Sequence, residues 1–177
     1  MATMQNATDG TNKSDAKYRT LTVQISKTMN RDGEIIVIED DVEDQELFGE
    51  ILQSLKINNK VLFFGDGEKA LAYLQQPNIE PFLILSDINL PRLNGFELRE
   101  RVFTNGELIK KCIPYIFFTT SASKEAVTNA YALSAQGFFI KPTRFSELEM
   151  IITLIVEYWK KCYSPSDYNV SVPTPTF

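Results

Sequence analysis

The sequence contains no histidine and only two cysteines among its 177 residues. Without histidine, the chain can form neither a Ser-His-Asp nor a Cys-His catalytic relay, and it cannot carry an internal phosphohistidine. The cysteines, Cys112 and Cys162, form no CxxC pair, which excludes a disulfide framework and a thiolate metal site. The chemistry that remains therefore rests on carboxylates, hydroxyls and lysine amines.

Long apolar runs and basic blocks are also missing. The longest strongly apolar run, residues 150–156, is far shorter than the roughly 20 residues that span a bilayer, and the polar N-terminus has no signal-peptide core. The formal net charge is -5, and no group of Lys and Arg is long enough to follow a phosphate backbone. We therefore expect a soluble, cytoplasmic protein that contacts neither a membrane nor nucleic acid directly.

The composition changes twice along the chain. Residues 1–32 are rich in Thr, Asn, Ser and Lys, which predicts a mostly disordered arm, although Leu21, Val23 and Ile25 alternate as in a short strand. Residues 164–177 carry three prolines and no helical pattern, which predicts an extended tail. Between them, residues 33–163 hold enough apolar residues for one folded domain.

Inside this domain, short apolar runs alternate with amphipathic segments. This alternation is typical of βαβ units, in which a parallel sheet is covered by helices on both faces. The strand candidates are residues 34–38, 60–64, 82–86, 113–118 and 137–140, and the helix candidates are residues 42–56, 67–75, 95–103, 124–134 and 144–161. The span 104–112 is expected to be a loop, since Asn105-Gly106 favours a helix end. The pattern predicts an α/β fold, a doubly wound five-stranded parallel sheet.

Polar residues follow several of the predicted strands. They are Glu39, Asp40 and Asp41 after the first strand, Asp87 after the third, Thr119, Thr120 and Ser121 at the fourth, and Lys141-Pro142 after the fifth. In the flavodoxin-like strand order 2-1-3-4-5, the first and third strands flank a crevice at one sheet edge, so the carboxylates should converge there. Clustered carboxylates repel one another, which favours a bound hard cation, and Mg²⁺ is the ion we expect. A central carboxylate can then attack a phosphoryl group, while a hydroxyl and an ammonium stabilise its oxygens.

Four segments in this order resemble the receiver domain of two-component response regulators. They are IIVIEDD at residues 35–41, LILSDINLP at 83–91 followed by Gly95, FFTTS at 117–121 and FIKP at 139–142. The resemblance covers residues 34–161. The Glu-Asp start, the LPRLNG loop and the Thr-Thr-Ser turn are also similar to the single-domain receivers that work beside bacterial phytochromes.

The resemblance implies a role for each matching residue. It implies that Asp87 is the phosphoacceptor, and that Mg²⁺ is held by Glu39, Asp40, Asp87 and the backbone carbonyl of Asn89. It also implies that Thr119 and Lys141 contact the phosphoryl group, so that Asp87, Lys141 and Thr119 carry the chemistry. Phe138 would be the aromatic that turns inward as Thr119 moves, and the Lys141-Pro142 peptide would be cis.

Two positions leave the register open. The acidic pair is Glu-Asp instead of Asp-Asp, and because Asp41 follows directly, we select Glu39 and Asp40 over Asp41. Thr119 is followed by two more hydroxyl residues, and its assignment rests on the spacing to Lys141.

The predicted function is that of a phosphorelay receiver, which is not an enzyme with an external substrate. Since the chain has no histidine, the phosphoryl donor would be a phosphohistidine on a sensor kinase or phosphotransfer protein, and the output would be contact with a downstream protein. One alternative is an adaptor of the same shape that is never phosphorylated. A second is an aspartyl-phosphate phosphohydrolase, although such enzymes usually carry a second Asp where this chain has Asn89.

The last predicted helix carries two apolar stripes. One stripe, formed by Leu148, Ile151, Ile152, Ile155 and Trp159, should face the core, and the other, formed by Met150, Leu154 and Tyr158, should face away from the sheet. Exposed apolar patches usually have a partner, so we expect a homodimer through the fourth and fifth predicted helices.

Overall fold

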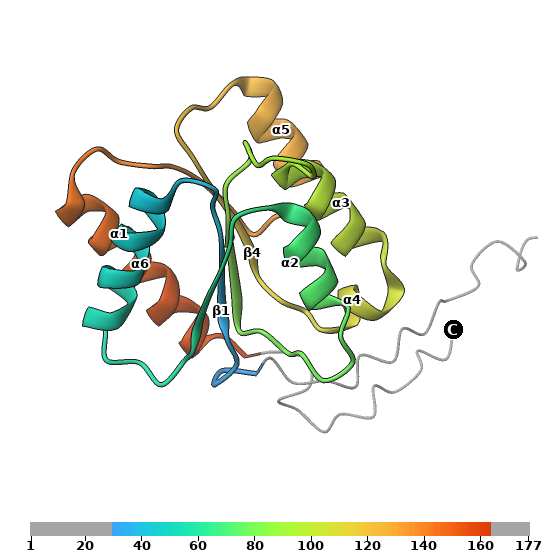
Figure 1. The fold of residues 1–177 in the computed structure, drawn as a ribbon, viewed down its shortest axis with the longest axis horizontal. Helices are drawn as coiled ribbons and strands as arrows, with labels where there is room; N and C mark the ends of the chain where they lie inside the picture. The colour runs from blue at the N-terminus through green and yellow to red at the C-terminus, as the bar shows by residue number, and fades with distance from the viewer. Residues whose placement is uncertain (1–29, 164–177) are drawn as a thin grey trace, which may run out of the picture.

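A computed structural model describes residues 30–163 of the chain (Figure 1). In this part of the chain, five strands alternate with helices. The strands are β1 (Ile35–Ile38), β2 (Val61–Phe64), β3 (Leu83–Ser86), β4 (Tyr115–Thr119) and β5 (Gly137–Ile140). The helices are α1 (Val42–Ser54), α2 (Gly67–Leu74), α3 (Gly95–Thr104), α4 (Gly106–Lys110), α5 (Lys124–Ala132) and α6 (Phe145–Lys161). The predicted arm and tail, with the strand around residues 21–25, lie almost entirely outside the described residues.

The five strands form one parallel sheet in the order β2-β1-β3-β4-β5. This confirms the predicted flavodoxin-like, doubly wound fold. Winding starts at β1 and proceeds toward β2 on one side and toward β3 on the other. The carboxyl ends of β1 and β3 are therefore adjacent, at the point where the direction of winding reverses.

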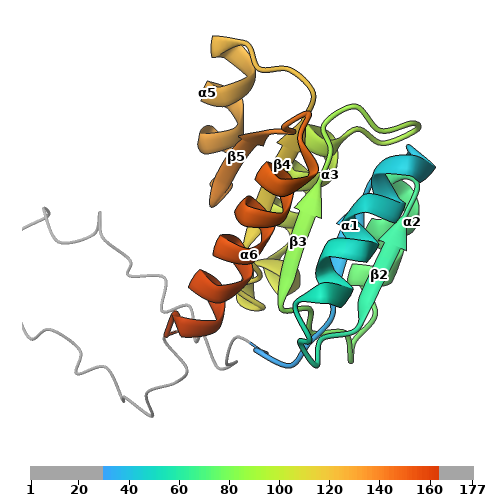
Figure 2. The ribbon, with the colours of Figure 1, turned by 90° about the vertical axis from the view of Figure 1, so that its left-hand side faces the viewer.

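Alternation along each strand divides the core into two layers. In β1, Ile35 and Val37 pack on one face with α1 and α6, while Ile36 and Ile38 pack on the other face with α2, α3, α4 and α5. Figure 2 shows α1 and α6 side by side over the same face of the sheet. All four residues of β1 are buried, so both faces of the strand contribute to the core.

Several helices begin with a capping side chain near the carboxyl edge of the sheet. Asp41 caps α1, Asp66 caps α2 and Ser123 caps α5, each by accepting hydrogen bonds from backbone N–H groups in the first helical turn. Asn94 and Glu97 form a reciprocal capping box at the start of α3. These caps fix the helix starts beside the loops that follow the strands.

The structure differs from the expected elements mainly between residues 104 and 115. Helix α3 does end at Thr104, but Asn105 then caps a further short helix, α4, by accepting from the N–H groups of Glu107 and Leu108. The fourth strand begins at Tyr115 and not at residue 113, because Pro114 has no N–H to donate to the sheet. Both differences leave the sheet order unchanged.

Candidate functional site

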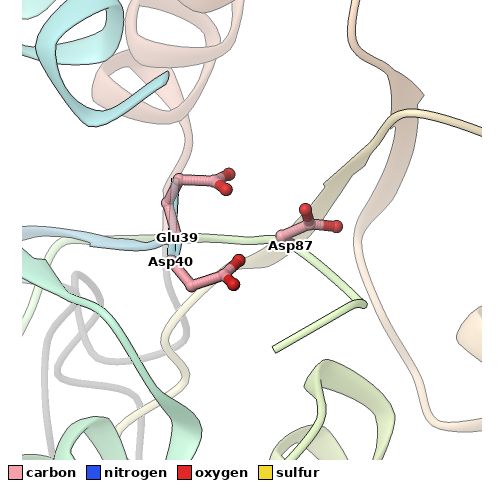
Figure 3. A group of neighbouring side chains, drawn as sticks. All are labelled: Glu39, Asp40 and Asp87. Atoms are coloured by element: carbon pink, nitrogen blue, oxygen red, sulfur yellow. The ribbon is translucent and has the colours of Figure 1, made fainter. Parts of the chain in front are cut away.

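Two buried acids follow the adjacent strands β1 and β3. Ile38 and Ser86 are partners in the strand register, so the residues after them, Glu39 and Asp87, are neighbours. Only 2% of Glu39 and 6% of Asp87 is exposed, whereas Asp40 beside them is exposed. Each of the three acids can offer one oxygen within 4.8 Å of the others. Figure 3 shows the Glu39 and Asp40 carboxylates extending from the end of β1 toward Asp87.

The third acid after β1, Asp41, has a different task. Its Oδ1 accepts from the backbone N–H groups of Glu43, at 2.8 Å, and Asp44, at 3.3 Å, so its side chain is used to cap α1. The structure therefore groups Glu39 and Asp40, but not Asp41, with Asp87.

The Asp87 carboxylate is held by the backbone that follows it. Its Oδ1 accepts from the N–H of Ile88 at 2.5 Å and from the N–H of Asn89 at 3.3 Å. Behind it, the Asp87 N–H donates to the Ile38 carbonyl at 2.8 Å, which joins the two strand ends. Asn89 itself is exposed and lies in the loop that leads from β3 to α3.

Lys141 reaches this group of acids from the loop after β5. Its Nζ donates to Glu39 Oε2 at 2.5 Å, to Asp44 Oδ2 at 2.7 Å and to Asp87 Oδ2 at 3.2 Å. The Lys141 side chain is 9% exposed, and its backbone N–H donates to the Thr119 carbonyl at 2.7 Å. The Lys141-Pro142 peptide is trans, which corrects the expectation of a cis bond. Trans is the more stable form of X–Pro bonds, and the lysine reaches the site in that form.

The protonation of the site is set by burial and by close charges. Burial raises the pKa of Glu39 to about 7, even though the hydrogen bond from Lys141 opposes this increase. Burial alone would lower the pKa of Lys141, but hydrogen bonds to Asp44 and Glu39 outweigh burial and raise this pKa above its ordinary value. The lysine is therefore charged, and the neighbouring acids compete for one cation.

Thr119 and Phe138 lie at the same edge or just beneath it. Thr119 ends β4 and is 1% exposed, while the next two hydroxyl residues, Thr120 and Ser121, are exposed. Phe138 is partly buried against the core layer of α2 to α5, with its ring centroid 6.3 Å from that of Phe117. The Thr119 carbonyl oxygen accepts the hydrogen bond from the Lys141 backbone N–H, which connects β4 to the site. Phe138 packs on the face of the sheet that α2, α3, α4 and α5 cover.

The donor set fits a hard divalent cation. Glu39, Asp40 and Asp87 contribute three carboxyl groups, and the Lys141 ammonium donates to two of them and to Asp44. Burial is the main cause of the raised pKa of Glu39, and the nearby Asp87 charge raises it further. Oxygen ligands, mostly carboxylates, are those that Mg²⁺, Mn²⁺ and Ca²⁺ use.

Asp44, which accepts from Lys141, is a residue of the site that the sequence did not predict. It lies in the first turn of α1, three residues after the helix cap Asp41. A signal was present, because a helix that directly follows β1 must begin at the carboxyl edge of the sheet. An acid in that first turn is therefore placed beside the strand ends.

The response regulator receiver domain family matches residues 35–153. The chain belongs to this family. Response regulator Rcp1 of Synechocystis sp. is 31% identical over 130 residues, which are 71% of this chain and 87% of Rcp1. The receiver domain is a phosphoacceptor signalling domain of two-component systems, in agreement with the site described above.

Two solved structures share both the fold and part of the sequence of this receiver domain. The phosphorylated cyanobacterial phytochrome response regulator RcpA is 30% identical, with a TM-score of 0.67, and the match covers 73% of this chain and 94% of RcpA. The Mn²⁺-bound form of Rcp1 is 30% identical, with a TM-score of 0.65, and the match covers 75% of this chain and 97% of Rcp1. Among residues 30–163 of the receiver domain, no helix is long and apolar enough to cross a membrane.

Proposed function

We propose that Asp87 accepts a phosphoryl group, with a Mg²⁺ ion held by Glu39, Asp40, Asp87 and the backbone carbonyl of Asn89. The observation that supports this best is the contact of Lys141 Nζ with both Glu39 and Asp87 beside the exposed Asp40. An ammonium next to a nucleophilic carboxylate in a buried acidic site is suited to stabilise phosphoryl oxygens. According to this proposal, the chain should form a metal-bound state like that of Rcp1 and a phosphorylated state like that of RcpA.

Asp87, Lys141 and Thr119 have different roles in the proposed phosphoryl transfer. Asp87 is the nucleophile, and the N–H groups of Ile88 and Asn89 fix one of its oxygens so that the carboxylate is oriented. Lys141 pairs with a phosphoryl oxygen, and the Thr119 hydroxyl donates to another. A bound Mg²⁺ supplies charge neutralisation for the phosphoryl oxygens.

The signal is a change of population between two states of the domain. Phosphorylation draws Thr119 toward Asp87, which opens space that Phe138 fills from its partly buried position on β5. The surface of α5, β5 and α6 changes as a result. The domain modifies itself and does not turn over an external substrate.

The donor and the partners follow from the same chemistry. Because the 177 residues contain no histidine, the donor is a phosphohistidine on a sensor histidine kinase or a phosphotransfer protein. The output is contact with a downstream protein. A homodimer through α5 and α6 is included in this proposal, because Met150, Leu154 and Tyr158 of α6 are 55%, 59% and 62% exposed.

The direct test is incubation with acetyl phosphate and Mg²⁺, followed by intact-mass measurement. We expect one added phosphoryl group in the wild type and none in Asp87→Asn. Absence of an Asp87-dependent modification would favour an unphosphorylated adaptor. Steady release of phosphate from many equivalents of a phosphate ester, dependent on Asp87, would favour a phosphohydrolase.

A further inference from the structure

The Lys141 ammonium has used all of its hydrogen-bonding capacity. An ammonium has three N–H donors, and here they go to Glu39, Asp44 and Asp87. Glu39 and Asp87 also belong to the acidic group whose oxygens lie within 4.8 Å of one another, together with Asp40. Asp44 is outside that group. Lys141 therefore donates to two candidate metal ligands, Glu39 and Asp87, and to one acid that is not a candidate ligand, Asp44.

Asp44 is fixed by a different element from the other two acids. It is in the first turn of α1, where a negative charge is favoured by the helix dipole, and its N–H donates to Asp41 Oδ1 at 3.3 Å. Its side chain is 31% exposed, compared with 9% for Lys141. The contact of 2.7 Å between Asp44 and Lys141 therefore joins the lysine to α1 and involves neither Glu39 nor Asp87.

We propose that Asp44 is a positioning residue, which keeps the Lys141 ammonium in the site when Glu39 and Asp87 turn their oxygens to a bound cation. The inference rests on the proposed function. Oxygens of Glu39 and Asp87 that ligate a divalent ion are less available to the lysine, and the ion repels the ammonium. Asp44 is the acceptor that remains, on the side of Lys141 formed by α1.

In this arrangement, one of the three N–H donors of Lys141 becomes available to the phosphoryl group when the contact with Asp87 is released. With acetyl phosphate, an Asp87 oxygen forms the new P–O bond, the P–O bond to the acetyl group breaks, and acetate leaves with the bonding electron pair. As the Asp87 carboxylate is converted to an acyl phosphate, its contact with Lys141, the longest of the three at 3.2 Å, is released. Lys141 then donates to a phosphoryl oxygen and keeps its hydrogen bond to Asp44.

The first measurement is the rate of Mg²⁺-dependent phosphorylation by acetyl phosphate in Asp44→Asn. This substitution keeps the shape and an acceptor oxygen but removes the charge, and the rate should fall about tenfold. The matched control is Glu43→Gln, which removes an exposed charge from the same helical turn and should keep the rate within about twofold. In a Lys141→Ala background, Asp44→Asn should change the residual rate by less than about twofold, because the two effects share one contact.

The second measurement does not require phosphorylation. Acylation of Lys141 by an amine-reactive reagent, followed by peptide mass analysis, reports how well the lysine is held in the site. In saturating Mg²⁺, we expect Lys141 to react about tenfold faster in Asp44→Asn than in the wild type or in Glu43→Gln. Without a divalent ion, the difference should be smaller, because Glu39 and Asp87 also hold the lysine.

The outcomes separate this inference from the proposed function. Phosphorylation of Asp44→Asn at the wild-type rate, with unchanged labelling of Lys141, would overturn the role of Asp44 and leave Asp87 as the phosphoacceptor. No phosphorylation of the wild type, together with faster labelling of Asp44→Asn, would overturn the proposed function and support Asp44 as the anchor of Lys141. Equal slowing by Glu43→Gln would show a general charge effect and would also overturn the inference.

Discussion

Gly95, the first residue of α3, lies so close to Asp87 that a β-carbon at position 95 would overlap the Asp87 carbonyl oxygen. The Gly95 N–H also donates to the Ile88 carbonyl at 2.8 Å, which closes the loop after β3. The glycine thus allows α3 to begin directly beneath the proposed phosphoacceptor.

We predict that Gly95→Ala lowers the free energy of unfolding by about 2 kcal/mol, because backbone atoms must move to admit the methyl group. The same shift should displace Asp87 and slow its phosphorylation. Gly106→Ala is the matched control, since nothing lies within 4 Å of a β-carbon there, and it should change stability by less than about 1 kcal/mol. Urea denaturation of the two variants gives the comparison, and equal stabilities would contradict the close approach.

Asp66 gives a prediction about acid sensitivity. It is fully buried, and although burial favours its neutral form, hydrogen bonds from the Lys69 N–H and from Arg92 hold its pKa below the ordinary value of 3.8. An acid whose pKa is lower in the folded state stabilises the fold above its unfolded pKa, and loses this contribution as pH falls through the folded pKa. Asp66→Asn should therefore cost about 1 kcal/mol at pH 7.

The difference between wild type and Asp66→Asn should shrink as the pH is lowered below about 4. Thermal unfolding at pH values from 7 to 3 measures it. Glu68→Gln is the control, because Glu68 is exposed and lies 3.7 Å from the same arginine, and a change of less than about 0.5 kcal/mol is expected. A constant difference at every pH would show that the Asp66 charge is not what stabilises the fold.

Arg99 is a buried cation that joins α3 to the end of α5. Its guanidinium donates to the carbonyls of Leu133, at 2.9 Å, and Ser134, at 2.7 Å, and lies 5.2 Å from the centre of the Tyr115 ring. Arg99→Met keeps the aliphatic stem but leaves both carbonyls without this donor, and should cost about 2 to 3 kcal/mol. The exposed Arg101 on the same helix provides the control Arg101→Met, with a cost below about 0.5 kcal/mol. Similar losses for both variants in urea denaturation would contradict this account.

The exposed stripe on α6 predicts how the domain associates. Leu154→Arg places a charge in the centre of that stripe and should abolish the proposed homodimer without a loss of folding. Ile109→Arg changes another exposed apolar residue, on α4, and should leave the dimer intact. Sedimentation velocity distinguishes the two, and a wild type that is monomeric before and after phosphorylation would remove the dimer from the account.

Most of the fold could be predicted from the sequence because its signals are local. The strands are short and apolar on both faces, which is typical of a parallel sheet between two helical layers, and the acids that follow them mark the carboxyl edge. Strand order followed from the resemblance and from the handedness of crossovers. The proximity of Glu39 and Asp87 then required only that their strands be adjacent.

The missed features depend on side-chain geometry that patterns do not encode. Asn105 ends α3 and also caps α4, so one residue that signalled a helix end also starts a helix of five residues. Asp44 resembled an ordinary acid in a first helical turn, and only the position of Lys141, 97 residues further along the chain, gives it a partner in the site. The trans form of the Lys141-Pro142 peptide was likewise not determined by the dipeptide itself.

The measurement that tests the central claim most directly is chemical mapping of the phosphorylated residue. Borohydride reduces an aspartyl phosphate to homoserine, which peptide mass spectrometry locates in the chain. After treatment with acetyl phosphate and Mg²⁺, we predict homoserine at position 87 alone, lost in Asp87→Asn and in the absence of a divalent ion. Homoserine at position 40 or 41, or the same yield without a divalent ion, would contradict the account.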